Sequence, residues 1–171
     1  VRRPVLSEDT ARTIAASLVG SRLDYANSVL HGASAKNITR VQRIQNALAR
    51  VVTRSRPRAH SPTLLQNLHW LPIQYRIQYK LAVLTFKARN NTAPYYLSSL
   101  ISNYQPPRML RSSSHLLLTV PRTKLVFSSR GFRSAGPCIW NALPDSVRQS
   151  ESLNIFKSRL KTTLFKAAFE C

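Results

Sequence analysis

KNITRVQRIQNALARVVTRSRPR, residues 36–58, combines two patterns that both repeat at the helical period. When successive residues are placed about 100° apart, the apolar residues fall on one stripe and the cations on a neighbouring one. The apolar stripe comprises Ile38, Val41, Ile44, Leu48, Val51 and Val52, and the basic stripe comprises Lys36, Arg40, Arg43, Arg50 and Arg54. The stretch therefore predicts an amphipathic helix that joins a hydrophobic core and carries a basic flank, ended by Pro57.

The basic stripe has no acidic residue beside it anywhere in residues 36–58. Like charges three or four residues apart repel one another by roughly 0.2–0.5 kcal/mol per pair, and no Asp or Glu relieves them here. A regular row of anions is what a phosphate backbone offers, so the missing anions are expected on a nucleic-acid partner. The alternative is an ordinary solvated flank on a core helix.

Composition strengthens the first interpretation. The chain has 171 residues, with 26 Lys and Arg against 6 Asp and Glu, which gives a formal net charge of +20. A hydrophobic content of 43% argues against wholesale disorder and suits one domain or two small units. Most of the cations are Arg, whose planar donor fork suits phosphate. A polyanion is therefore the expected partner.

Cysteine usage and the absence of apolar runs favour an intracellular protein of the nucleus or cytoplasm over a secreted one. Cys138 and Cys171 are too few for a disulfide framework. No run of about 18 apolar residues could span a bilayer, and Glu8 and Asp9 interrupt any secretion signal. The chain begins with Val rather than Met, so it is expected to be a piece of a longer protein.

Capping residues and prolines divide the first part of the chain into several more helices. These are expected over residues 7–20, capped by Ser7, and then over 21–32, 62–70, 72–90 and 94–101. The helix opened by Pro72 repeats the two-stripe pattern. Its basic stripe is Arg76, Lys80 and Lys87, and its apolar stripe is Ile73, Ile77, Leu81 and Leu84.

The remainder of the chain has a different texture. Residues 103–114 contain paired prolines and a serine run and are expected to form a linker. Residues 115–129 hold two short β-prone runs that suggest a β-hairpin, and Ser152 is expected to cap a terminal helix. The predicted fold is therefore mainly α, with a helical bundle over residues 1–102, the linker, and a small α+β unit over residues 115–171.

No catalytic residue, metal ligand or cofactor site is expected in this chain. Its six acids provide no plausible two-metal carboxylate cluster, and its four histidines lack ligand spacing such as HExxH. No phosphate-binding GxxxxGK[ST], nucleophile-elbow GxSxG or dinucleotide fingerprint occurs. Trp70 and Trp140 lie among apolar residues and are expected in the core.

Several long segments appear in a characteristic order: SRLDYANSVLHG, VQRIQNALARVV, LHWLPIQYRIQYKLAVLTFKA and GFRSAGPCIWNALPDSVRQSESLNIFKSRLKTTLF. Together they resemble the thumb and following segment of the reverse transcriptase of non-LTR, LINE-type retrotransposons, of the chicken-repeat and jockey-like sort, over residues 6–169. The resemblance implies a helical thumb that grips an RNA template and DNA primer. It also implies upstream polymerase and endonuclease domains, with Mg²⁺ only in the polymerase palm.

The catalytic Asp pair of that family is absent, and Asp24 in LDYANS does not replace it. The chain is therefore expected to be a non-catalytic fragment of an RNA-directed DNA polymerase. Its expected partner is nucleic acid, and no membrane partner is expected. The candidate phosphate-binding residues are Lys36, Arg40, Arg43, Arg50, Arg54, Arg56, Arg58, Arg76, Lys80 and Lys87. The alternative is an adaptor whose basic amphipathic helices expose apolar faces to an acidic protein or an anionic membrane surface.

Overall fold

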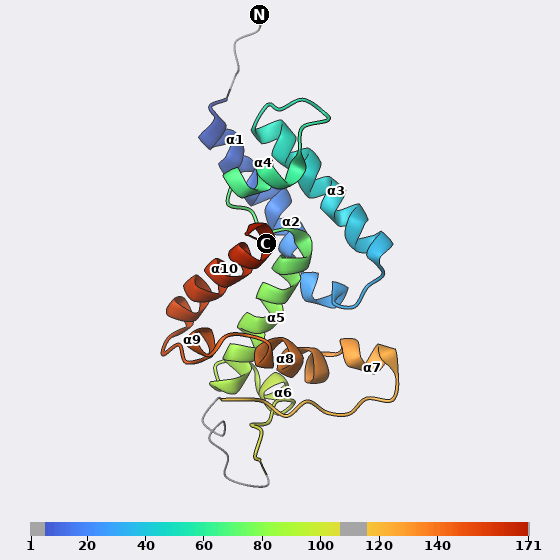
Figure 1. Ribbon diagram of the computed structural model, residues 1–171, viewed down its shortest axis with the longest axis vertical. Coiled ribbons are helices and arrows are strands. Elements are labelled where there is room, and N and C mark those ends of the chain that lie inside the picture. Colours follow the sequence, from blue (N-terminus) through green and yellow to red (C-terminus); the bar gives the residue numbers. More distant parts are fainter. Residues whose placement is uncertain (1–5, 107–115, 171) are drawn as a thin grey trace, which may run out of the picture. The chain divides into compact units, whose positions relative to one another are not determined.

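The computed structural model describes residues 6–106 and 116–170, and the described chain is mainly helical, as expected (Figure 1). These residues form two compact units. The first unit contains the described residues up to Arg76 and those from Phe165 onward, and the second contains Ile77–Leu164. The predicted domain boundaries stay a prediction, and residues 107–114 of the predicted linker lie outside the described residues. Within the described parts, no helix is long and apolar enough to cross a membrane.

The first unit begins with a helix that its own sequence caps. Helix α1 (Glu8–Ala15) starts after Ser7, whose Oγ accepts a hydrogen bond from the Thr10 N–H at 3.2 Å, so the predicted cap is confirmed. A π-helical turn, η1 (Ala16–Gly20), and the short α2 (Ser21–Asp24) continue it. A 3₁₀ turn, η2 (Asn27–Leu30), follows.

Helix α3 (Ala35–Val52) is the basic amphipathic helix, and it ends five residues before Pro57 rather than at it. The chain leaves the helix because Arg54 adopts a left-handed backbone conformation, with φ of 50°. The Thr53 hydroxyl donates to the Ala49 carbonyl, and the Ser55 N–H donates to the Arg50 carbonyl. These bonds satisfy the last carbonyls of the helix without the proline.

The buried face of α3 is rotated from the predicted apolar stripe. Gln45, Ala49 and Val52 are buried, whereas Ile44 and Val51 are 53% and 73% exposed. The prediction was wrong for these two residues because α1 and α4 (Ser61–Asn67) cover α3 only on the side of Ala49. The apolar stripe of a helix can be wider than the face that the neighbouring helices bury.

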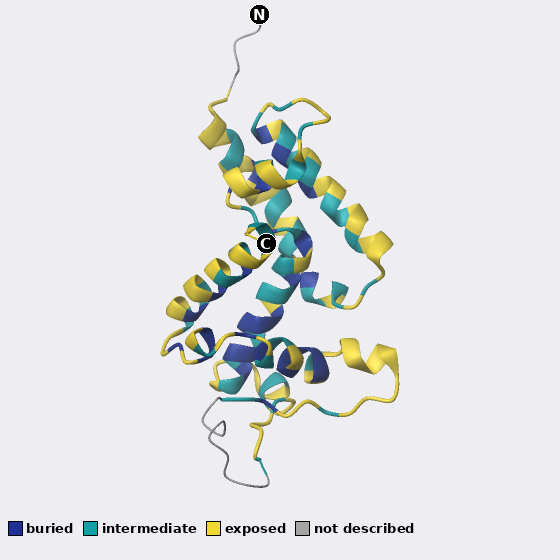
Figure 2. Cartoon of the chain, in the orientation of Figure 1, coloured by how far each residue is buried: buried dark blue, intermediate teal, exposed yellow. Residues whose placement is uncertain are grey.

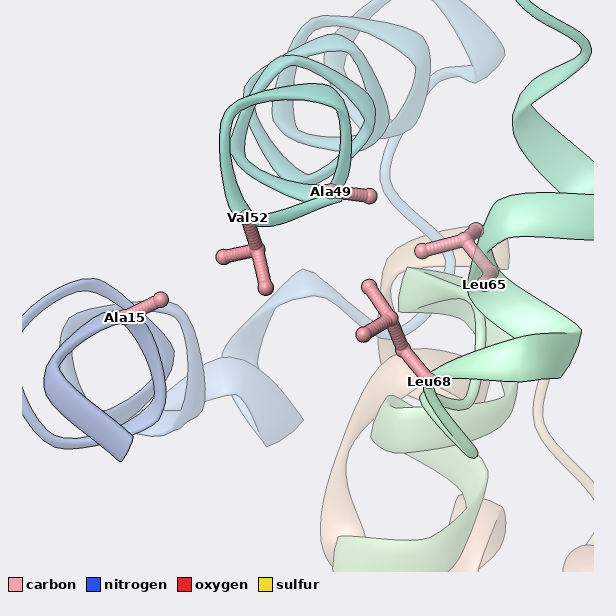
Figure 3. Close-up of a cluster of buried hydrophobic side chains, with 5 residues drawn as sticks. All are labelled: Ala15, Ala49, Val52, Leu65 and Leu68. Atoms are coloured by element: carbon pink, nitrogen blue, oxygen red, sulfur yellow. The ribbon is translucent and has the colours of Figure 1, made fainter. Parts of the chain in front are cut away.

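Three helices of the first unit meet around small side chains. Figure 3 shows Ala15 of α1 facing Val52 and Ala49 of α3, with Leu65 of α4 and Leu68 completing the cluster. Trp70 is half-buried and packs against this cluster, so its predicted core position is met only in part. The small alanine side chains allow the helices to approach closely, and this increases the number of dispersion contacts between them.

A polar joint links α3 to the start of α5 (Ile73–Arg89). Gln45, although buried, donates through Nε2 to the Leu71 carbonyl at 2.8 Å, and Gln42 Oε1 accepts from the Ile73 N–H at 2.9 Å. The Gln42 amide also donates to Gln45 Oε1 at 3.0 Å. The glutamines therefore pair backbone groups at the beginning of α5 that would otherwise be buried without partners.

The second unit is built around an aromatic cluster. Trp140 of α8 (Phe132–Asn141) is 0% exposed, and its ring centroid lies 5.7 Å from that of Phe156 in α10 (Leu153–Phe169). Phe86 of α5 stacks on Phe156 at 4.5 Å. The indole N–H of Trp140 donates to the Leu116 carbonyl at 2.8 Å. The predicted core position of Trp140 is therefore confirmed.

Shorter helices complete this unit: α6 (Tyr95–Ser98), α7 (Val126–Arg130) and α9 (Asp145–Arg148). Pro94 and Pro144 directly precede α6 and α9, as predicted from their fixed φ. Ser152 caps α10, because its Oγ accepts from the Ile155 N–H at 3.3 Å.

The predicted β-hairpin is not formed among the described residues of 115–129. The second β-prone run folds into α7, and the first run pairs with an earlier segment through an antiparallel bridge between Leu118 and Asn103. On its other side, Leu118 is bound by a side chain: Asn141 accepts from its N–H at 2.9 Å and donates to its carbonyl at 2.8 Å. An amide side chain thus takes the place of a second strand.

Candidate nucleic-acid interface

Three of the predicted cations form an exposed row on α3. Lys36, Arg40 and Arg43 follow one another at helical spacings of four and three, so they share one face and span about 10 Å along the axis. Within residues 6–106 and 116–170, the structure gives none of them a carboxylate or hydrogen-bond partner. Their charges therefore face solvent without internal compensation.

Arg50 was predicted in the same row but has a structural role. Its Nη2 donates to Ser61 Oγ at 2.6 Å and to the Ala59 carbonyl at 3.4 Å, and the side chain is half-buried. These bonds hold the loop between α3 and α4. A phosphate could engage Arg50 fully only by competing with them.

The cations beyond the end of α3 lie in the loop that precedes α4. Arg54 donates to the Leu6 carbonyl, which ties the loop to the beginning of the described chain. Arg56 and Arg58 are exposed. The loop therefore offers two solvent-facing guanidinium groups beside one that is already engaged.

Arg76 is neutralised by an acid far away in the sequence. Its Nε donates to Asp24 Oδ1 at 2.8 Å and its Nη2 lies 2.5 Å from Asp24 Oδ2, which is a bidentate pair across 52 positions. Asn27 also donates to Asp24 Oδ1, at 3.3 Å. Fork-to-fork pairs of this kind are among the stronger charge-assisted contacts. Helical periodicity alone could not have revealed this pairing.

Lys80 and Lys87 continue the predicted stripe of α5 but belong to the second unit. Lys80 is exposed and Lys87 is half-buried. The structure therefore groups Lys36, Arg40 and Arg43 as one exposed row, which is the candidate interface, with Arg56 and Arg58 in the loop after the same helix.

The first unit also contains an apolar groove, which was not predicted from the sequence. The groove lies between α1 and α3 and has a volume of about 210 Å³. Its walls include Leu18, which is 66% exposed, and Val51, which is 73% exposed. On α3 the groove is lined by Leu48, Val51 and Val52, in the part of the helix that follows the basic row.

Within the described parts of the chain, no group of three or more His, Cys, Asp or Glu side chains is placed to hold a metal ion. Comparison with protein-family models, with curated proteins and with solved structures finds no match to this chain. The assignment of function therefore depends on the geometry of the basic row and on the sequence resemblance.

Proposed function

We propose that this chain is a non-catalytic fragment of a retrotransposon reverse transcriptase whose own activity is sequence-independent binding to a nucleic-acid duplex. The observation that carries the proposal is the exposed, uncompensated row of Lys36, Arg40 and Arg43 on α3. The row contacts phosphates, which position a protein on a duplex without reading its bases. Template and primer, as RNA, DNA or their hybrid, are the proposed partners.

The salt dependence of binding follows from the number of cations that are available. Each neutralised phosphate contributes a slope of about −0.9 to log affinity against log salt, so the three cations of the row give about −2.7, and about −4.5 if the exposed Arg56 and Arg58 also contact phosphates. Arg50 and Arg76 are excluded from this number because Ser61 and Asp24 already engage them. A slope near zero would contradict the proposal.

The decisive experiment reverses the charge of the row. In the variant Lys36→Glu, Arg40→Glu, Arg43→Glu, each substitution changes the net charge by −2, so the formal charge falls from +20 to +14. All three side chains are exposed, so thermal melting should be unchanged. Duplex affinity at low salt should fall by several kcal/mol, since charge-assisted contacts contribute about 1.5–3 kcal/mol each.

A matched control separates the site from the net charge. The variant Arg22→Glu, Lys161→Glu, Lys166→Glu makes the same change from +20 to +14 at exposed positions outside the row. Binding of a labelled RNA–DNA hybrid, followed by fluorescence anisotropy, should be much weaker for the row variant than for the control. Equal losses would show that overall charge, and not this interface, drives binding.

The same proposal predicts no nucleotide incorporation by this chain alone on a primed RNA template with Mg²⁺ or Mn²⁺. Polymerases hold their metal ions with converging carboxylates, and the paired Asp residues of the family are absent from the sequence. Extension that persists through repurification would contradict the assignment.

A second candidate function is docking of an acidic amphipathic helix, and the apolar groove between α1 and α3 favours it. A helix with apolar residues at i, i+4 and i+7 fits such a groove, and acidic residues on it would suit a chain with a net charge of +20. Against a general adaptor role, Ile73, Ile77 and Leu81 of α5 are buried. Binding of a Leu- and Glu-containing model helix that is lost in Leu18→Asp, with duplex binding intact, would favour this candidate.

A further inference from the structure

The second unit exposes a group of consecutive apolar side chains at α7. Leu125, Val126 and Phe127 are 67%, 74% and 80% exposed, and Figure 2 shows the whole of α7 as exposed. Large apolar side chains that are exposed singly are ordinary, but three in succession form a patch. We call these three residues the α7 knuckle.

Cations surround the knuckle on both sides in the sequence. Arg122 and Lys124 precede it, Arg130 and Arg133 follow it, and all four are exposed. No acidic residue occurs from Leu116 to Pro144, and none of the four cations has a partner among the residues that the structure describes. The knuckle therefore suits a ligand that presents apolar surface and negative charge together.

The geometry discriminates between ligands of this kind. Val126 and Phe127 are successive residues of α7 and diverge by about 100°, while Leu125 precedes the helix in extended backbone. The three side chains therefore lack the spacings of three or four with which a helix enters one protein groove. A helix of five residues is also too short to lie along a membrane with a continuous apolar face. An unpaired nucleic-acid strand can bend around the knuckle and offers bases and phosphates on one polymer.

We propose that the α7 knuckle binds single-stranded nucleic acid, with Phe127 stacking on an unpaired base and the four flanking cations contacting phosphates. Phe127 is the most exposed of the three residues and the only aromatic one among them. Stacking on aromatic side chains tolerates any base, because every base has a π face. The inference extends the proposed nucleic-acid binding but depends on residues of the other unit.

The test compares the full chain on a blunt duplex with the same duplex carrying an unpaired overhang of about eight nucleotides, in RNA and DNA forms. The overhang should increase affinity, and Phe127→Ala should reduce the overhang affinity by about 5-fold to 150-fold. Phe127→Trp should retain it. The blunt-duplex affinity should not change in either variant.

Leu125→Ala is the matched control, because it removes an exposed apolar side chain that has no π face. It should lose much less affinity for the overhang than Phe127→Ala does. Equal losses in the two variants, or no loss in either, would overturn the proposal. Binding to phosphatidylserine vesicles that Phe127→Ala abolishes, while strand binding stays unchanged, would overturn it in favour of a lipid surface.

The same measurements separate this inference from the α3 interface. Reversal of Lys36, Arg40 and Arg43 should weaken binding to the blunt duplex and leave the ratio of overhang to blunt affinity intact. If that reversal has no effect while Phe127→Ala removes the advantage of the overhang, the inference stands and the α3 interface fails. If only the α3 reversal has an effect, the inference is overturned.

Discussion

Gly136 of α8 lies close to Thr85 of α5, and replacing it with Ala tests the packing of the second unit. A Cβ at this position would lie 2.8 Å from Thr85 Oγ1 and 3.3 Å from Phe132 Cε2. Thr85 is 0% exposed, and its hydroxyl donates to the Leu81 carbonyl at 2.9 Å, so turning the side chain away would break that bond. The added methyl group therefore meets a neighbour that resists movement.

The magnitude is the balance of two effects. Ala is usually favoured over Gly inside a helix by about 0.8–1 kcal/mol, but Pro137 directly follows Gly136 and disfavours helical backbone at a residue that carries a Cβ, so little of this gain is expected. Overpacking a filled interior costs about 1–3 kcal/mol. We therefore expect Gly136→Ala to lower the free energy of unfolding by about 1–3 kcal/mol in the native background.

The cost should shrink when Thr85 is also shortened. In a Thr85→Ala background the atom at 2.8 Å is absent, so Gly136→Ala should lower the free energy of unfolding by about 1 kcal/mol less than it does in the native background. Urea denaturation of the native chain, both single variants and the double variant gives the coupling energy directly. Coupling close to zero, or stabilisation by Gly136→Ala alone, would refute the packing of α8 on α5 described above.

Three further predictions concern other contacts. Trp140→Ala should lower the free energy of unfolding by about 3–5 kcal/mol because the ring is fully buried, and Trp140→Phe should cost less; thermal melting of both measures this. Gln45→Leu should lower the free energy of unfolding by about 1–3 kcal/mol because the Leu71 carbonyl loses its hydrogen-bond donor. Gln74→Leu at an exposed position is the control, and an equal loss of stability in both variants would contradict the prediction. Burial lowers the pKa of His31 below 6.5, so the unfolded chain binds the proton more readily than the folded chain. The contribution of neutral His31 to stability should be complete above pH 6.5 and should fall as the pH drops below that value. Denaturant titrations at several pH values should show a weaker pH dependence of the unfolding free energy in His31→Gln.

Much of the helical fold is readable from local sequence signals. Helix α1 starts after Ser7, and α6 and α9 each start after a proline. These starting points depend on atoms within one helical turn, so capping rules predict them directly. The end of α3 did not follow from Pro57, because side-chain and loop hydrogen bonds close the helix earlier. The predicted hairpin failed for a related reason: Leu118 pairs with Asn103 in an earlier segment and with the Asn141 amide, 23 positions away.

The candidate interface divides in the same way. The sequence by itself determined that α3 is helical, basic and amphipathic, because periodicity and charge are properties of consecutive residues. Only the tertiary structure decided which cations face solvent without a partner. Arg50 is engaged by Ser61 and Arg76 by Asp24, whereas Arg40 and Arg43 remain exposed. Compensation of a charge depends on groups brought close by folding, because hydrogen bonds and ion pairs act over a few ångströms whatever the separation along the chain.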